Sequence, residues 1–151
     1  MAGRLQDKVA FVSGGGSGIG AATALRFAAE GATVVICGRR REPLDEVVAR
    51  IRAAGGKAEA VVADVSDETQ YVTAVEDAAR RHGRLDVLVN NAMAYSWGAI
   101  EATTTPDWHL NFRTSVDGTF WGTRTAMKLM KPHGGSIVNI SSICGTLGTA
   151  W

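Results

Sequence analysis

The feature that most constrains the fold is a glycine-rich turn that separates a short apolar run from a helix-like segment. The apolar run covers residues 9–12, residues 21–30 favour helix, and between them the chain reads Ser13-Gly14-Gly15-Gly16-Ser17-Gly18-Ile19-Gly20. An uninterrupted apolar run is typical of a central parallel strand with both faces covered. The turn therefore joins a buried strand to a helix.

Such a turn is suited to hold a phosphate group. A helix that begins in it directs unpaired N–H groups and the positive end of its dipole at one point. A loop with few side chains also lets a ligand approach the backbone, although the same loop could serve only as a tight turn. We expect nucleotide binding here, with these cofactor-binding residues: Ser13, Gly14, Gly16, Ser17, Gly18, Ile19 and Gly20.

Further apolar runs alternate with helical patterns along the chain. The expected strands are residues 9–12, 33–37, 60–63, 85–89 and 137–140. One of the expected helices begins with Thr105 as N-cap and Pro106 in the first helical position, and continues towards Pro132. This alternation predicts an α/β fold with an open, doubly wound and mostly parallel sheet, in which ligands bind beyond the carboxyl ends of the strands.

Composition narrows the function classes. The formal net charge is +1, from 16 Lys and Arg against 15 Asp and Glu, so we expect neither a nucleic-acid nor a membrane partner. Residues 1–8 are too polar for a signal peptide. Cys37 and Cys144 are expected to be reduced, buried thiols in a cytoplasmic protein. The three histidines lack metal-ligand spacing, so no metal site is predicted.

Three arginines follow the second expected strand, where an acidic residue would bind a ribose 2′-hydroxyl. The chain reads Gly38-Arg39-Arg40-Arg41 at this point. An arginine can hold a 2′-phosphate through two N–H donors, whereas a carboxylate would repel it. A solvated helix start is the alternative, but cations there oppose the helix dipole. We expect Arg39 to select NADP rather than NAD, with Arg40 or Arg41 assisting it.

Polar residues also follow the later strands. Asp64 and Val65 stand at the end of the third expected strand. The Asp64 carboxylate could accept a hydrogen bond from an adenine amino group, or it could cap the helix that starts near Asp67. The fourth strand is followed by Asn90-Asn91-Ala92, and the fifth by a segment that contains Ser142. Asn and Ser at strand ends can also be turn formers only.

In combination, these motifs resemble those of the short-chain dehydrogenase/reductase family. The family's T-G-x-x-x-G-x-G turn is matched from Ser13 to Gly20, its N-N-A-G motif at Asn90-Asn91-Ala92 with Met93 in place of glycine, and its strand-end serine at Ser142. The resemblance implies a Rossmann-type domain over residues 1–151, a nicotinamide cofactor bound in part by Asn90, Asn91 and Ala92, and oxidation or reduction of a small-molecule alcohol or ketone. It also implies a homo-oligomer in the full-length form.

Two departures bear on catalysis. Ser115 stands seven residues after Trp108, where the family has a catalytic asparagine. Ser115 and Ser142 are therefore the two expected catalytic residues. The family's Tyr-x-x-x-Lys segment has no counterpart, because residues 143–151 contain neither tyrosine nor lysine. We therefore expect a truncated domain, with a sheet incomplete at its C-terminal edge and no efficient catalysis of its own. A non-catalytic nucleotide-binding or interaction module is the alternative.

Overall fold

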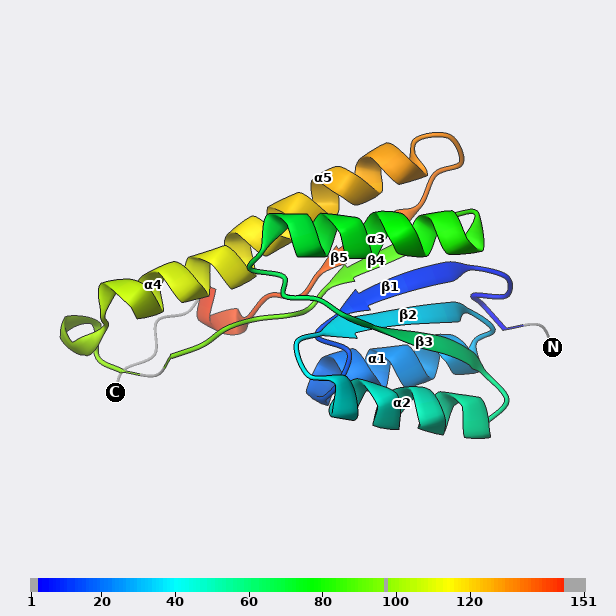
Figure 1. Cartoon of the computed structure of the whole chain (residues 1–151), viewed down its shortest axis with the longest axis horizontal. Coiled ribbons are helices and arrows are strands. Elements are labelled where there is room, and N and C mark those ends of the chain that lie inside the picture. The colour runs from blue at the N-terminus through cyan, green and yellow to red at the C-terminus, as the bar shows by residue number, and fades with distance from the viewer. Residues whose placement is uncertain (1–2, 97, 146–151) are drawn as a thin grey trace.

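The structure, a computed structural model, describes residues 3–96 and 98–145, and its centre is a five-stranded parallel sheet. The strands are β1 (Val9–Ser13), β2 (Thr33–Gly38), β3 (Lys57–Val62), β4 (Val87–Asn90) and β5 (Ser136–Asn139). They lie in the order β3-β2-β1-β4-β5 (Figure 1), and every neighbouring pair is parallel. The predicted doubly wound sheet is therefore confirmed, and its order reverses beside β1, where such folds bind ligands.

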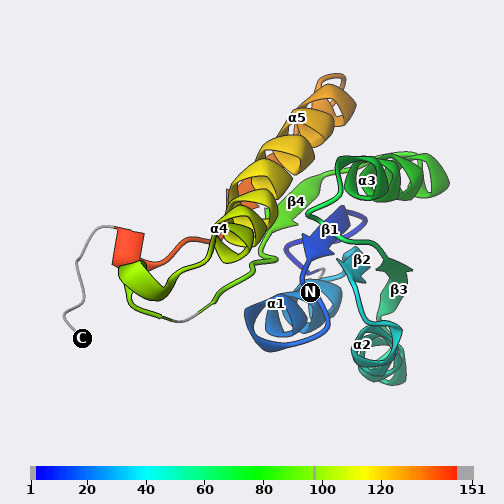
Figure 2. The ribbon, with the colours of Figure 1, turned by 60° about the vertical axis from the view of Figure 1, so that its left-hand side comes forward.

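Helices cover both faces of this sheet. Figure 2 shows α1 (Gly18–Ala29) and α2 (Arg41–Ala53) on one face, and α3 (Glu68–His82) and α5 (Gly118–Met130) on the other. The chain reaches α5 through α4 (Thr105–Phe112) and a π-helical turn, η2 (Arg113–Asp117), which continue in one direction. There are also two short 3₁₀ turns in the described residues. The first, η1 (Ile100–Ala102), precedes α4, and the second, η3 (Ile143–Gly145), comes after β5.

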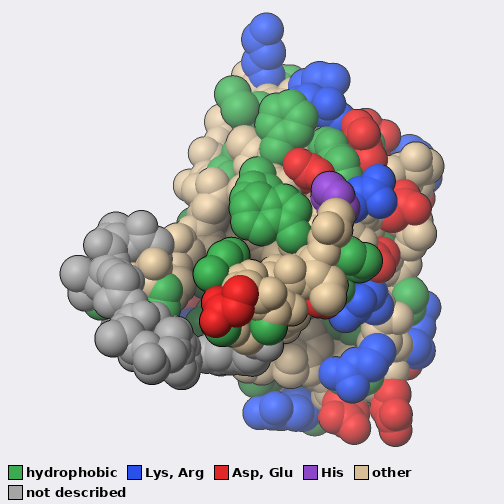
Figure 3. Space-filling view, turned by 90° about the vertical axis from the view of Figure 1, so that its left-hand side faces the viewer, with side chains coloured by type: hydrophobic (Ala, Val, Ile, Leu, Met, Phe, Trp, Pro, Cys, Tyr) green, Lys and Arg blue, Asp and Glu red, His purple; other side chains and the backbone are tan. Residues whose placement is uncertain are grey.

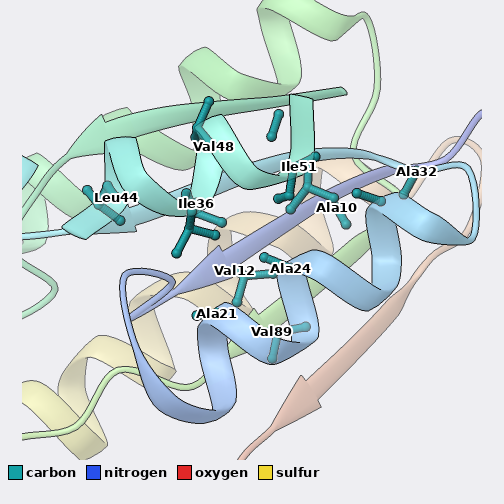
Figure 4. Packing of buried hydrophobic residues seen from close by; sticks show 14 of the residues in the cluster. Ala10, Val12, Ala21, Ala24, Ala32, Ile36, Leu44, Val48, Ile51 and Val89 are labelled. Carbon is teal, nitrogen blue, oxygen red and sulfur yellow. The ribbon is translucent and has the colours of Figure 1, made fainter. Parts of the chain in front are cut away.

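The two-residue period of the strands divides the core into two layers. In β1, Ala10 and Val12 face α1 and α2, where they pack with the predicted apolar stripe of α2 (Figure 4): Leu44, Val47, Val48 and Ile51. Phe11 lies between them in sequence and faces the opposite layer, which α3 and α5 complete with Val75 and Ala126. Because successive strand residues point to opposite faces, one apolar strand supplies both layers.

Several element boundaries differ from the prediction. β3 begins at Lys57 rather than residue 60, because it is an edge strand whose charged Glu59 pairs with Arg81 on the surface. The N-cap of α4 is Thr104 rather than Thr105: its hydroxyl accepts a hydrogen bond from the Asp107 N–H at 3.3 Å. The run Thr103-Thr104-Thr105 offers three candidate caps, so the sequence pattern did not distinguish them.

The two cysteines differ in burial. Cys37 is buried in β2 as predicted, and burial raises the pKa of its thiol to about 12. The prediction of a buried thiol is wrong for Cys144, which is exposed. It lies in η3, a short segment beyond the edge strand β5, whose own residues are mostly exposed. Both thiols are unpaired.

Candidate functional site

A cleft of about 360 Å³ lies at the carboxyl ends of the strands, on the face that Figure 3 looks onto. Its walls come from the glycine-rich turn after β1, from the segments that follow β2, β3 and β4, and from the start of η2. The structure brings together most of the expected cofactor residues in its lining: Gly14, Gly16, Ser17, Gly18, Ile19, Arg39, Asp64, Val65, Asn91 and Ala92.

The glycine-rich turn presents open backbone to this cleft. Gly14 and Gly18 have φ angles of +66° and +52°, a region that favours glycine. A Cβ on Gly18 would meet no atom within 4 Å, so its outer side is free space. Ser17, the N-cap of α1, makes no side-chain hydrogen bond to the helix. The first N–H groups of α1 therefore remain able to bind an anion.

Ser13 lies beneath the cleft and ties β1 to β4. Its hydroxyl donates to the carbonyl of Val89 at 3.3 Å and accepts from the backbone N–H groups of Asn91 and Ala92 at 3.0 and 3.1 Å. The Asn91 side-chain amide in turn donates to the carbonyls of Ser13 and Gly14, at 2.9 and 3.3 Å. These bonds hold the glycine-rich turn against the end of β4.

Gly20 and Asn90 also lie outside the cleft lining. A Cβ on Gly20 would come within 2.2 Å of the Gly14 carbonyl oxygen, so only glycine allows the turn to close over α1. The Asn90 amide is directed into the protein, where its Oδ1 accepts from the Tyr71 hydroxyl at 2.8 Å and its Nδ2 donates to Asn139 Oδ1 at 2.9 Å. In this structure both residues support the cleft from behind.

Arg39 and Arg40 border the end of the cleft that follows β2. Arg41, the next residue, is engaged elsewhere, with Asp45 at 3.6 Å and the Ala60 carbonyl at 3.4 Å. Among the residues that the structure describes, no carboxylate forms an ion pair with Arg39 or Arg40. Both guanidinium groups are therefore available to an anionic ligand.

Asp64 faces the same end of the cleft. Its Oδ1 accepts hydrogen bonds from the N–H and hydroxyl of Ser66, at 2.9 and 2.7 Å. The N-cap of α3 is Asp67, which accepts from the Gln70 N–H at 3.0 Å, so the alternative in which Asp64 caps this helix does not apply. A carboxylate held in this way keeps its second oxygen for a ligand.

The expected catalytic serines lie outside the cleft lining. Ser115 is exposed in η2, and its carbonyl accepts from the Thr119 hydroxyl at 2.8 Å. Ser142 is exposed after β5, and its hydroxyl accepts from the Cys144 N–H at 3.2 Å. Sequence reasoning did not assign a ligand role to several residues that line the cleft, namely Gly38, Pro43, Leu44, Ala63, Met93, Ala94 and Thr114. Of these, only Met93 carried a signal, as a departure from the family motif.

Neither a metal site nor a membrane span is found in the described ranges. Within residues 3–96 and 98–145, no group of three or more His, Cys, Asp or Glu side chains is placed to hold a metal ion. The helices in those ranges are also too short or too polar to cross a membrane.

Comparison with known proteins gives consistent matches along the chain. Residues 8–151 match the family model described as short chain dehydrogenase. The chain is 40% identical to a 3beta-hydroxysteroid dehydrogenase of Mediterraneibacter gnavus, over 97% of the chain and 53% of that protein. It is also 40% identical to a cyclopentanol dehydrogenase of Comamonas testosteroni, over 97% of the chain and 59% of that protein. The chain thus spans just over half the length of these relatives.

Solved structures show the same fold. A putative short-chain dehydrogenase/reductase from Burkholderia xenovorans superimposes with a TM-score of 0.93 and 38% identity, over 97% of this chain and 60% of that one. A short chain dehydrogenase from Burkholderia cenocepacia, solved in complex with NADP, superimposes with a TM-score of 0.90 and 36% identity, over 97% and 60% of the two chains.

Proposed function

Because the chain belongs to the short-chain dehydrogenase family, we propose that it forms the cofactor-binding part of an NADP(H)-dependent oxidoreductase that interconverts an alcohol and its carbonyl compound. The observation that carries the choice of NADP is the position of Arg39 and Arg40 at the β2 end of the cleft, without an ion-pair partner in the described part of the chain. The structure solved with NADP supports this choice.

The residues present fit a dinucleotide along the cleft. The 2′-phosphate would lie at Arg39, the adenine at Asp64 and Val65, and the pyrophosphate at the first N–H groups of α1, at the end of the glycine-rich turn. Ser13 and Asn91 hold this turn against β4, so they position the backbone donors. When bound, the nicotinamide ring supplies or accepts a hydride.

Ser142 and Ser115 are the proposed catalytic contributors. A hydroxyl at Ser142 would donate one hydrogen bond to the reacting oxygen of a small-molecule alcohol or ketone, which orients and polarises it. At Ser115 the backbone carbonyl accepts a hydrogen bond from the Thr119 hydroxyl, so this carbonyl is held within the helix. Neither serine provides the proton transfer that the family assigns to its tyrosine.

We therefore propose that these 151 residues bind the cofactor but do not transfer hydride efficiently. A missing general acid or base typically lowers the rate by about two to four powers of ten. A non-catalytic nucleotide-binding or interaction module is the second candidate, because cofactor binding by Gly14, Gly18 and Arg39 in the cleft needs neither a catalytic tyrosine nor a lysine.

Cofactor titration and turnover test these proposals together. We expect calorimetric titration to show tighter binding of NADP⁺ than of NAD⁺, and NADPH absorbance to stay constant with a panel of ketones. Equal affinity for the two cofactors would contradict the NADP assignment. Turnover at ordinary enzyme rates of about 1–1,000 per second would contradict the proposed lack of a proton relay.

A homo-oligomer is proposed as well. Trp108, Phe112, Val116 and Phe120 follow one another at four-residue spacing along α4, η2 and α5, and all four side chains are exposed. Trp108 and Phe112 stack with ring centroids 4.3 Å apart. An exposed apolar stripe of this kind favours an interface with a second copy. Sedimentation that detects only monomers, or is unchanged in Phe120→Asp, would contradict it.

We also propose a cytoplasmic location. The support is the pair of free thiols at Cys37 and Cys144, because unpaired cysteines are typical of reducing compartments.

A further inference from the structure

Met93 places an exposed apolar side chain in the cofactor cleft. It follows Ala92 directly after β4, lines the cleft, and is 66% exposed. The family motif has glycine at this position, so this side chain is a departure from the motif. An exposed methionine that no core surrounds is available to contact a ligand.

The backbone at Met93 accommodates a side chain without strain. Among the described non-glycine residues, only Asp7 has a positive φ angle, so Met93 does not adopt the conformation that would demand glycine. The motif glycine is therefore not required here for backbone reasons. What differs between glycine and methionine at this position is the surface offered to the cleft.

Strand order determines which half of a dinucleotide Met93 would meet. β1 lies between β2 and β4, so the glycine-rich turn after β1 separates Arg39, after β2, from Met93, after β4. With the 2′-phosphate at Arg39 and the pyrophosphate at the turn, the nicotinamide half extends towards β4. Among the described residues, the lining has one other exposed large apolar side chain, that of Ile19. It lies at the start of α1, whereas Met93 follows β4.

We propose that the Met93 side chain packs against the nicotinamide half of the bound cofactor and contributes to the affinity of this site for that half. The proposal rests on the proposed NADP(H) function. The thioether is flexible and polarisable, and it makes favourable contacts with the edges and faces of aromatic rings. Arg39 then sets affinity for the adenosine half and Met93 sets affinity for the nicotinamide half.

Two ligands separate this contact from a structural role. NADP⁺ contains both halves, whereas adenosine 2′,5′-bisphosphate contains the adenosine half with its 2′-phosphate and lacks nicotinamide. We expect Met93→Gly to weaken NADP⁺ binding about ten-fold, because most of an apolar side chain would no longer be covered, and to leave the bisphosphate within about two-fold. Met93→Leu, similar in volume, should retain most of the NADP⁺ affinity.

Met127 offers a matched control. It is 62% exposed, lies on α5, and does not line the cleft. Met127→Ala should leave binding of both ligands unchanged. Met93→Ala, measured beside Met93→Gly with a thermal melt of each, guards against a folding effect of the glycine.

The outcomes are distinct. NADP⁺ affinity that is unchanged or increased in Met93→Gly overturns the contact while leaving the proposed function intact. Equal weakening of NADP⁺ and the bisphosphate also overturns it, because a structural role would affect both. A wild-type chain that binds neither ligand overturns the proposed function and this inference with it.

Discussion

The hydroxyl of Tyr71, on α3, donates a hydrogen bond of 2.8 Å to Oδ1 of Asn90 at the end of β4. Both side chains are buried, and burial raises the pKa of the Tyr71 phenol, which keeps it protonated as the donor. The bond orients the Asn90 amide, whose Nδ2 then donates to Asn139 on β5. One phenol therefore contributes to the alignment of the two strands beside the cleft.

Removing this hydroxyl should destabilise the fold. In Tyr71→Phe the buried Oδ1 of Asn90 loses its donor, which we expect to lower the free energy of unfolding by about 1–3 kcal/mol. Urea denaturation followed by circular dichroism measures the change. An unaltered midpoint would mean that Oδ1 finds another donor.

Gly18 should be required for cofactor binding but not for folding. Its φ of +52° is strained for a valine, and free space lies beyond it, so Gly18→Val should cost about 1–2 kcal/mol of stability while its side chain blocks the pyrophosphate. Gly55→Val is the control, because Gly55 has a φ of +80° and also has no neighbour within 4 Å, but lies outside the cleft lining. Only Gly18→Val should lose NADP⁺ binding in titration calorimetry. Retained binding would show that the turn does not approach the ligand.

Arg39 should determine the preference for NADP. Arg39→Asp replaces a donor with a carboxylate that repels the 2′-phosphate, so the ratio of NADP⁺ to NAD⁺ affinity should change by at least the value of a charged hydrogen bond, about 1.5–3 kcal/mol. Arg80→Asp makes the same charge change on α3, outside the cleft, and should leave the ratio as it was. Paired titrations with both cofactors measure it. An unchanged ratio in Arg39→Asp would make Arg39 a surface cation only.

Asp86 should make stability fall in acid. Burial raises the pKa of its carboxyl, but hydrogen bonds from Arg84 and the Val9 N–H, with the charges of Arg84 and Lys8, outweigh burial and lower it overall. Because the folded-state pKa lies below the unfolded value of about 3.9, the contribution is complete above that value and is lost as pH falls through the folded pKa. Asp86→Asn should therefore be less stable than wild type at neutral pH, and the difference should shrink below about pH 4. Denaturant melts across this range test it, and a constant difference would assign the effect to packing.

Much of the fold was determined by local sequence. The apolar run of β1, the glycine-rich turn and the apolar stripe of α2 each depend on residues close in the chain, and each lies where it was predicted. The order of strand-end motifs likewise brought Gly18, Arg39, Asp64 and Asn91 to one cleft, because parallel strands present their carboxyl ends at the same edge.

Tertiary structure alone decided which polar groups meet. Asn90 and Asn91 are adjacent in sequence, yet one amide turns inward to Tyr71 and the other binds the glycine-rich turn, since successive residues at a strand end point in opposite directions. The exposed start of β3 was missed because Glu59 is held by Arg81, a partner distant in sequence. Met93 entered the cleft lining in the same way: its neighbours there come from four different strand ends, and no local pattern contains them. Period and propensity act over a few residues, whereas these contacts depend on how the whole sheet is wound.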